Sequence, residues 1–217
     1  MEILIVPVED GSIKDSKIES VEVVNPSKII YLQDIKDEFL IPEDKQGVKD
    51  IGSERVNLGD IWESSFEVIN NVTSNYDDSK SNFFIDVSLV KGDFRAAMIV
   101  AAFTKGIKVF TRQNDELILL PIYKFTYYRE LTDKKKEILE LLFEAEGQEM
   151  GLETLSEKTN MSLPLISYHI NGNQKSEGLK ELGLVTSREE KGRSYIHLTS
   201  MGRMLLKGHV KHEPENK

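Results

Sequence analysis

The chain has 217 residues, of which 39% are hydrophobic, and it carries a formal net charge of -9 and no cysteine. This length suffices for two small domains, and the lack of cysteine excludes disulfides, thiolate metal sites and thiol catalysis. No segment approaches the ~20 consecutive apolar residues of a membrane span, and the first residues lack the basic flank of a secretory signal. We therefore expect a cytoplasmic protein with no membrane partner.

In the first part of the chain, short apolar segments alternate with amphipathic ones. We expect helices at 16–24, at about 57–74 with Asn57 or Asp60 as the cap, and from Asp93 to Gly106 with Asp93 as the cap. We expect strands at residues 2–8, 28–32, 82–88, 107–111 and 116–120. Residues 33–57 remain unassigned. The alternation predicts a parallel α/β sheet, so we interpret residues 1–124 as a Rossmann-like domain.

In such sheets, ligands bind beyond the carboxyl ends of the strands, where the strand order reverses. Two loops of this sequence, 8–12 and 88–93, directly follow the carboxyl ends of predicted strands. They are the predicted ligand-binding edge of the domain.

From Leu131 onward the pattern is helical. Thr132 caps a helix that ends at Gly147, a short helix covers 152–159, and Ser162 caps a third helix that stops at Asn171-Gly172. The tight turn between the second and third helices predicts a helix-turn-helix.

The remaining segments complete this pattern. A short helix ending at Gly183 precedes a hairpin of strands 186–189 and 194–198, and Thr199 caps a last helix, 200–207. The series predicts a winged helix-turn-helix over residues 131–211, after a linker at 125–130 and before a disordered tail at 212–217. Between Ile170 and Leu179, an insertion breaks the compact form of this fold.

The charge is unevenly distributed between the two regions. Residues 1–130 carry 15 Lys+Arg and 23 Asp+Glu, whereas residues 158–211 carry 9 basic and 4 acidic residues. A basic region is the electrostatic requirement for binding nucleic acid, so the second region is the one suited to duplex DNA.

The third helix enters the major groove N-terminus first in a helix-turn-helix. The residues that flank or lie opposite the apolar Ile166 and Ile170 are the candidates to face the bases, with a solvated helix face as the alternative: Ser162, Leu163, Ser167, Tyr168 and Asn171. The candidates for phosphate or minor-groove contacts are basic: Lys175, Arg188, Lys191 and Arg193. We expect His169 to be a packed or capping histidine, and no metal ligands.

Several of these segments resemble archaeal regulators that join a CRISPR-associated Rossmann-fold (CARF) domain to a winged helix-turn-helix. Residues 167–172, 177–179 and 182–185 resemble the winged helix, and residues 85–102 are similar to the strand, turn and helix of the CARF ligand motif. The resemblance implies a homodimer that binds duplex DNA, with cyclic oligoadenylate as an effector and no other cofactor.

The resemblance also implies the residues that bind the effector. Residues of the motif turn match by type: Ser88, Lys91, Gly92 and Arg95. Residues of the first loop match in position only: Val8, Glu9, Asp10 and Gly11. Because Asp93 would cap the motif helix and the first loop is acidic, a degenerate sensor serving as a dimerisation scaffold is the alternative.

Other function classes are less well matched. An acidic pocket formed by Glu9, Asp10 and Asp86 with Lys91 would suit a Mg²⁺-dependent phosphoryl-accepting domain, and a nuclease would use similar carboxylates. A protein-interaction adaptor is a third class. No Walker, GxSxG or HExxH motif occurs, so we expect a DNA-binding transcription regulator, without catalytic residues and not an enzyme.

Overall fold

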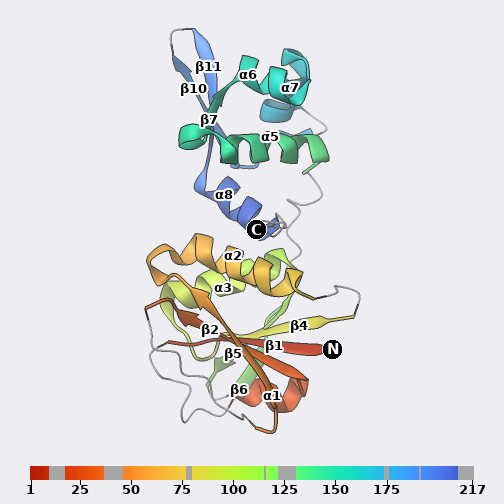
Figure 1. Cartoon of the computed structure of the whole chain (residues 1–217), viewed down its shortest axis with the longest axis vertical. Helices are drawn as coiled ribbons and strands as arrows, with labels where there is room; N and C mark the ends of the chain where they lie inside the picture. Colours follow the sequence, from red (N-terminus) through yellow and green to blue (C-terminus); the bar gives the residue numbers. More distant parts are fainter. Residues whose placement is uncertain are drawn as a thin grey trace, which may run out of the picture. The chain divides into compact units, whose positions relative to one another are not determined.

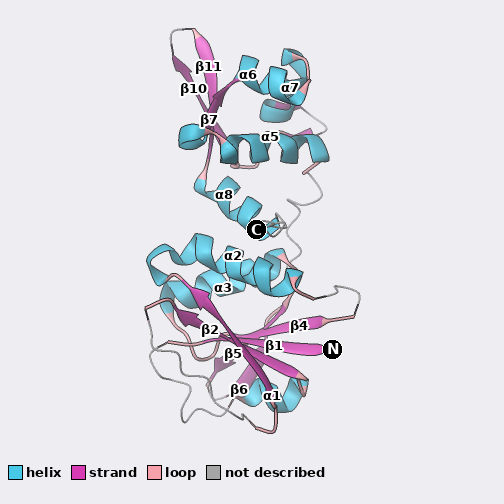
Figure 2. Ribbon diagram, in the orientation of Figure 1, coloured by secondary structure: helices cyan, strands magenta, loops and turns pink. Residues whose placement is uncertain are grey.

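The computed structural model describes residues 1–9, 18–36, 46–76, 80–114, 116–121, 131–173, 176–190 and 192–209. The chain divides into two compact units, Met1–Lys124 together with Lys207–Lys217, and Phe125–Leu206 (Figure 1). Each unit has its own sheet and its own helices (Figure 2). The predicted linker at 125–130 and tail at 212–217 lie outside the described residues.

A six-stranded sheet forms the centre of the N-terminal unit, with the strand order β3-β2-β1-β4-β5-β6. The strands are β1 (Glu2–Pro7), β2 (Lys28–Asp34), β3 (Asp50–Val56), β4 (Asn82–Asp86), β5 (Lys108–Gln113) and β6 (Glu116–Leu119). The first five are parallel, and β6 pairs antiparallel with β5. The order reverses between β1 and β4, as in doubly wound sheets, so the mixed α/β sheet fits a Rossmann-like fold.

Helices cover both faces of this sheet. α2 (Ile61–Ser74) and α3 (Gly92–Thr104) lie on one face and α1 (Glu19–Val24) on the other (Figure 2). Val21 of α1 packs in a core with Leu4 and Val6 of β1. Because both faces are covered, the central strand is a continuous apolar run and not an alternating one.

The predicted cap at Asn57, the helix end at Gly106 and the hairpin turn at Asn114 are confirmed in this unit. Asn57 Oδ1 accepts a hydrogen bond of 3.0 Å from the Gly59 N–H and so caps the 3-10 turn η1 (Leu58–Asp60) that leads into α2. Gly106 follows α3 with φ of 68°, and Asn114 sits in the β5–β6 hairpin with φ of 49°. These left-handed conformations favour glycine and asparagine.

Two features of this unit differ from the prediction. The unassigned segment contains β3, an edge strand whose only aliphatic side chains are Ile51 and Val56, too few to identify it. α3 begins at Gly92 with Lys91 as its N-cap residue and no side-chain cap, so Asp93 lies inside the first turn and does not cap the helix.

The C-terminal unit contains four helices in its described part, with a small sheet beside them. The helices are α5 (Asp133–Glu144), α6 (Leu152–Thr159), α7 (Leu163–Asn171) and α8 (Ser200–His209), and a 3-10 turn, η2 (Glu146–Gln148), follows α5. The antiparallel sheet has the order β10-β11-β7, formed by β7 (Glu149–Gly151), β10 (Val185–Glu190) and β11 (Arg193–Leu198).

Most predicted features of this unit are confirmed, including its two threonine caps. Thr132 Oγ1 accepts from the Lys135 N–H, and Thr199 Oγ1 accepts from the Gly202 N–H at 3.1 Å. α5 ends at Glu144, three residues before the predicted Gly147. β7 was not predicted from the sequence, because three residues are too few to show the alternation of a strand.

The insertion after α7 forms a miniature hairpin of β8 (Gly172–Asn173) and β9 (Ser176–Glu177). Gly172 and Gly178 lie close together at the base of this hairpin, which we call the neck. A Cβ on Gly178 would lie 2.3 Å from the backbone nitrogen of Gly172. The predicted short helix ending at Gly183 is wrong: residues 179–183 form turns. The chain reverses at Gly172 and Gly178 and passes through these turns directly into β10.

Candidate nucleic-acid interface

The turn between α6 and α7 gives the C-terminal unit a helix-turn-helix arrangement. Asn160 ends α6 in the left-handed conformation with φ of 52°, and Met161 of the turn is buried. Ser162 then begins α7, and Pro164 lies in its first turn, where a helix needs no N–H donor. The local sequence therefore fixes where α7 starts.

One side of α7 is buried and the other is outward. Ile166, His169 and Ile170 are at most 7% exposed and hold the helix against the unit. The opposite side, which we call the outward face, is exposed apart from the half-buried Ser167: Ser162, Leu163, Pro164, Leu165, Ser167, Tyr168 and Asn171. All five residues that the sequence analysis placed opposite the core lie on this face.

Sequence reasoning missed two outward residues, Pro164 and Leu165. A leucine next to an isoleucine in a short helix is ordinarily assigned to the core. The helical spacing carried the correct signal, because residues 166, 169 and 170 define one stripe, and Leu165 lies about 100° away from Ile166. Leu165 is 41% exposed.

Asn171 and Ser167 form a local pair on the outward face. Asn171 Nδ2 donates to the Ser167 carbonyl oxygen and to Ser167 Oγ, each at 3.1 Å. This contact sets the direction of the Asn171 amide at the end of α7.

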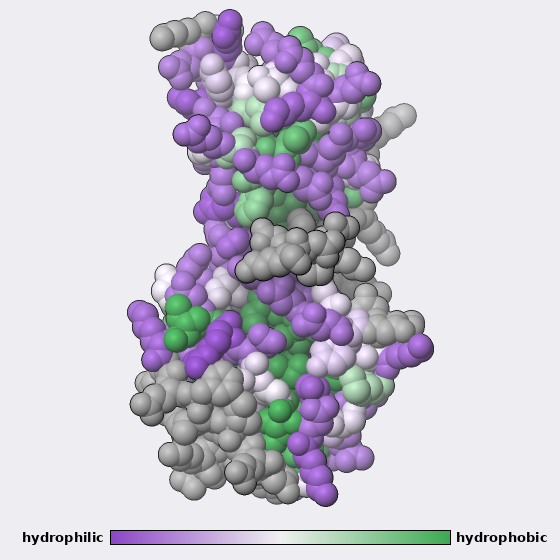
Figure 3. All heavy atoms as spheres, viewed as in Figure 1, coloured by the Kyte–Doolittle hydropathy of each residue, from purple (hydrophilic) through white to green (hydrophobic). Residues whose placement is uncertain are grey.

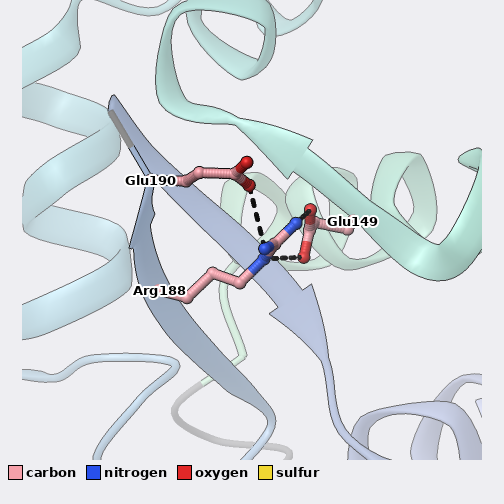
Figure 4. Close-up of polar contacts among 3 residues, drawn as sticks. All are labelled: Glu149, Arg188 and Glu190. Atoms are coloured by element: carbon pink, nitrogen blue, oxygen red, sulfur yellow. Dashed lines mark hydrogen bonds and ion pairs between the residues drawn. The ribbon is translucent and has the colours of Figure 1, made fainter. Parts of the chain in front are cut away.

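Arg188 of the β10–β11 hairpin is already engaged by carboxylates (Figure 4). Its Nε and Nη2 donate to Glu149 Oε2 and Oε1, both at 2.7 Å, and its Nη1 donates to Glu190 Oε2 at 3.0 Å. The bidentate hydrogen bond lowers the pKa of the Glu149 carboxyl and raises that of Arg188. This pairing ties β10 to β7, and a phosphate would have to compete with it for Arg188.

The other predicted phosphate contacts have different outcomes. Arg193 is exposed at the start of β11. Lys175 and Lys191 lie outside the described residues. Arg193 is thus the described cation of the hairpin that best fits a phosphate contact.

A buried cation lies beneath the C-terminal end of α7. Lys135 of α5 is 1% exposed, and its Nζ donates to the Glu177 carbonyl oxygen at 2.6 Å and to Ser176 Oγ at 3.2 Å. Burial lowers the pKa of His169, and the charges of Lys135 and Lys134 lower it further. His169 is therefore a neutral, packed histidine at pH 7, as the sequence predicts.

In the N-terminal unit, the strand order reverses beside Asp86 at the end of β4. Asp86 is 2% exposed; its Oδ2 accepts from Ser20 Oγ at 2.5 Å and its Oδ1 accepts from the Ser88 N–H at 2.9 Å. A carboxylate enclosed in this way does not form the open acidic pocket of a phosphoryl-accepting domain. Asp10, the neighbouring carboxylate of that alternative, lies outside the described residues.

The predicted effector-binding residues are only partly brought together. Ser88 borders a cavity of about 40 Å³ with Asp86 and Arg112, which has room for water and not for a nucleotide. Val8 is buried, Glu9 is half-buried, and Lys91 and Gly92 are exposed at the start of α3, all outside this cavity. Asp10 and Gly11 lie outside the described residues.

Arg95 has a structural contact where the sequence suggested a ligand contact. Its Nε donates to the Val90 carbonyl oxygen at 2.6 Å and its Nη2 to that of Ser88 at 3.4 Å. The guanidinium therefore holds the turn between β4 and α3.

Metal sites and membrane spans are both absent from the described parts of the chain. No group of three or more His, Asp or Glu side chains there could hold a metal ion. No described helix is long and apolar enough to cross a membrane.

No protein-family model and no curated protein sequence matches the chain. Among solved structures, AbsC, a MarR family transcriptional regulator from Streptomyces coelicolor, matches 38% of this chain and 53% of its own at 24% identity and a TM-score of 0.33. Csm6 from Enterococcus italicus, bound to cyclic hexa-2'-fluoro-hexa-dAMP, matches 74% of this chain and 49% of its own, at 10% identity and a TM-score of 0.40.

Can2 from Sulfobacillus thermosulfidooxidans, in complex with cyclic tetra-adenylate, matches 96% of this chain and 64% of its own, at 9% identity and a TM-score of 0.36. This chain thus spans about half the length of AbsC and Csm6. With every TM-score below 0.5, these likenesses assign neither a family nor a function, and they give the archaeal source named in the resemblance no support.

The comparisons overturn one expectation from the sequence, that the chain is not an enzyme. Csm6 and Can2 are CARF-domain effector enzymes, and each matches a larger part of this chain than AbsC does. The structures that match parts of this chain thus include enzymes as well as regulators, so the exclusion of enzymes was wrong.

Proposed function

We propose that this chain is a DNA-binding transcription regulator of winged-helix type. The observation that carries the proposal is the outward face of α7, which follows a tight helix–helix turn and precedes a hairpin. In winged helices the second helix of the turn enters the major groove. α7 carries no acidic side chain, so a polyanion meets no opposing charge on it.

We divide the proposed DNA contacts into those made to bases and those made to phosphates. We assign base contacts to the outward face of α7, and phosphate contacts to Arg193 of β11, since cations position a protein on the DNA backbone without reading sequence. Lys175 and Lys191 remain sequence-based candidates for the same role. A homodimer would present two copies of α7 to two half-sites one helical turn apart.

We also propose residues 1–124 as a regulatory domain and residues 131–211 as the DNA-binding domain. The first turn of α3 supports a nucleotide effector such as cyclic oligoadenylate, because no side chain caps it and free N–H groups at a helix N-terminus favour anions. Lys91 adds an exposed positive charge there. Asp93 in the same turn opposes it.

A protein-interaction adaptor is the second candidate. The observation that favours it is the exposure of Leu163, Leu165 and Tyr168, since exposed apolar side chains on one helix also suit a protein partner. The two candidates differ in their response to salt, because release of counterions is specific to nucleic acid.

Fluorescence anisotropy of the full-length protein with duplexes from its own promoter tests the proposal, at ~50 and ~200 mM salt and with or without cyclic tetra-adenylate. We expect the affinity to fall about 40-fold over this range for three phosphate contacts, and further for each additional one. Binding that ignores the nucleotide would remove the effector from the proposal and leave DNA binding intact. No binding at either salt concentration would overturn the regulator and favour the adaptor.

A further inference from the structure

The outward face of α7 is apolar rather than charged. In the part of the chain that the structure describes, nine large hydrophobic side chains are exposed, and three of them belong to this nine-residue helix: Leu163 (46%), Leu165 (41%) and Tyr168 (36%). Pro164 beside them is also exposed. In the view of Figure 3 the C-terminal unit is mainly hydrophilic, with a hydrophobic strip in its middle. Three exposed apolar side chains on one short helix suit a partner with apolar groups.

The major groove offers one such group. Guanine is read by Arg or Lys and the cytosine amino group by Asp or Glu, and α7 contains none of these residues. The thymine C5-methyl is the apolar group of the groove and is read by apolar contact, whereas adenine is read by Asn or Gln. Leucine, tyrosine and asparagine on α7 are therefore complementary to A·T pairs.

Leu163 and Leu165 lie about 160° apart around the helix, at the two edges of the outward face, and Tyr168 lies beside Leu165. Leu163 is the first residue of α7, and recognition helices enter the groove at this end. The buried Ile166 and Ile170 fix the rotation of the helix about its axis. From Leu163 to Asn171 the face extends about 12 Å, close to the rise of four base pairs.

We propose that α7 recognises thymine methyl groups in the major groove, with Leu163, Leu165 and Tyr168 as specificity-determining contacts, and that the protein selects A·T-rich half-sites. This inference rests on the proposed function, since it takes duplex DNA as the ligand of α7. Asn171 lies on the same face, and its amide would have to leave Ser167 to form the bidentate contact with an adjacent adenine.

Selection by the full-length protein from a random-sequence duplex pool, followed by exchange of thymine for uracil, tests the inference. Uracil keeps the base pair and lacks only the methyl group. We expect the selected sequences to contain A·T pairs at the half-site. We expect the uracil duplex to bind about fourfold more weakly per contacted methyl, and uracil outside the half-site to have no effect.

Leucine variants provide the matched control. Leu163→Ala and Leu165→Ala should weaken binding to the thymine duplex and bring the thymine-to-uracil affinity ratio toward one. Leu119→Ala, which truncates a leucine that is 50% exposed on β6, should leave the ratio as in the wild type. Circular dichroism shows whether each variant is folded.

The outcomes separate this inference from the proposed function. Enrichment of G·C half-sites, or equal affinity for thymine and uracil duplexes, would overturn the methyl readout and leave DNA binding standing. If no sequence is enriched and no duplex binds, both proposals fail, and the apolar face is assigned to a protein partner.

Discussion

Two arginines of the same hairpin, Arg188 and Arg193, have different surroundings. Arg188 is bound by the carboxylates of Glu149 and Glu190, whereas Arg193 is exposed at the start of β11. A carboxylate partner offsets the charge that a phosphate would otherwise attract. Sequence alone treats the two residues alike, because Glu149 lies on a different strand.

Arg193→Ala should therefore reduce the slope of log affinity against log salt by about one, the value for one lost phosphate contact. Arg188→Ala should leave the slope nearly unchanged, since it removes a cation that is already paired. Anisotropy titrations over a salt series measure both slopes. Equal reductions in the two variants would show that Arg188 leaves its carboxylates on binding.

His169 gives the C-terminal unit a pH dependence. Burial, then Lys135 and Lys134, lower its pKa from the 6.5 of the unfolded chain. The unfolded chain thus binds the proton first, so the stability due to neutral His169 is complete above about pH 6.5 and is lost as the pH falls through the lowered pKa. His169→Gln should lose less thermal stability than the wild type on acidification from pH 7 to about pH 5. Parallel melting curves for the two proteins would refute this.

At the scale of elements, the glycine neck determines how the chain leaves α7. Gly172 has φ of 77° and Gly192 has φ of 76°, but a Cβ on Gly172 would lie 2.3 Å from the Gly178 nitrogen, whereas a Cβ on Gly192 meets nothing within 4 Å. Gly192→Ala should cost about 1–2 kcal/mol of unfolding free energy from the left-handed backbone alone. Gly172→Ala should cost about 1–3 kcal/mol more, because backbone must move. Chemical denaturation of both variants measures the difference, and equal losses would show that the neck is not constrained.

Elements with a strong local signal could be predicted from the sequence. The apolar run of β1, the caps at Thr132 and Thr199, and the stripe of Ile166 and Ile170 determine structure through near neighbours. Other elements could not be predicted. The strands β3 and β7 depend on pairing with distant strands, and the turns at 179–183 depend on the close approach of Gly172 and Gly178 at the neck. For the same reason the sequence located the outward face of α7 and missed the pairing of Arg188.

At the scale of the whole molecule, one chain joins a Rossmann-like sheet to a helix-turn-helix unit. In the proposed regulator, the first would respond to a ligand where its strand order reverses, and the second would read duplex DNA. The proposal of a regulator depends on the second property, and the effector is an independent part of it. DNA binding through α7 is therefore the claim to test first.

The most direct test places a carboxylate at the N-terminal end of α7. Ser162 is the exposed N-cap residue, with no cap hydrogen bond from its side chain. Aspartate is a good N-cap, so Ser162→Asp should keep the fold and repel DNA. Thr132→Asp, at the N-cap of α5, is the matched control.

Anisotropy with promoter duplex at ~50 mM salt gives the answer. The account predicts that the wild type and Thr132→Asp bind alike, and that Ser162→Asp binds at least about tenfold more weakly with an unchanged melting temperature, because like charges are brought together. Equal binding by all three proteins, or no binding by the wild type, would contradict DNA recognition through α7.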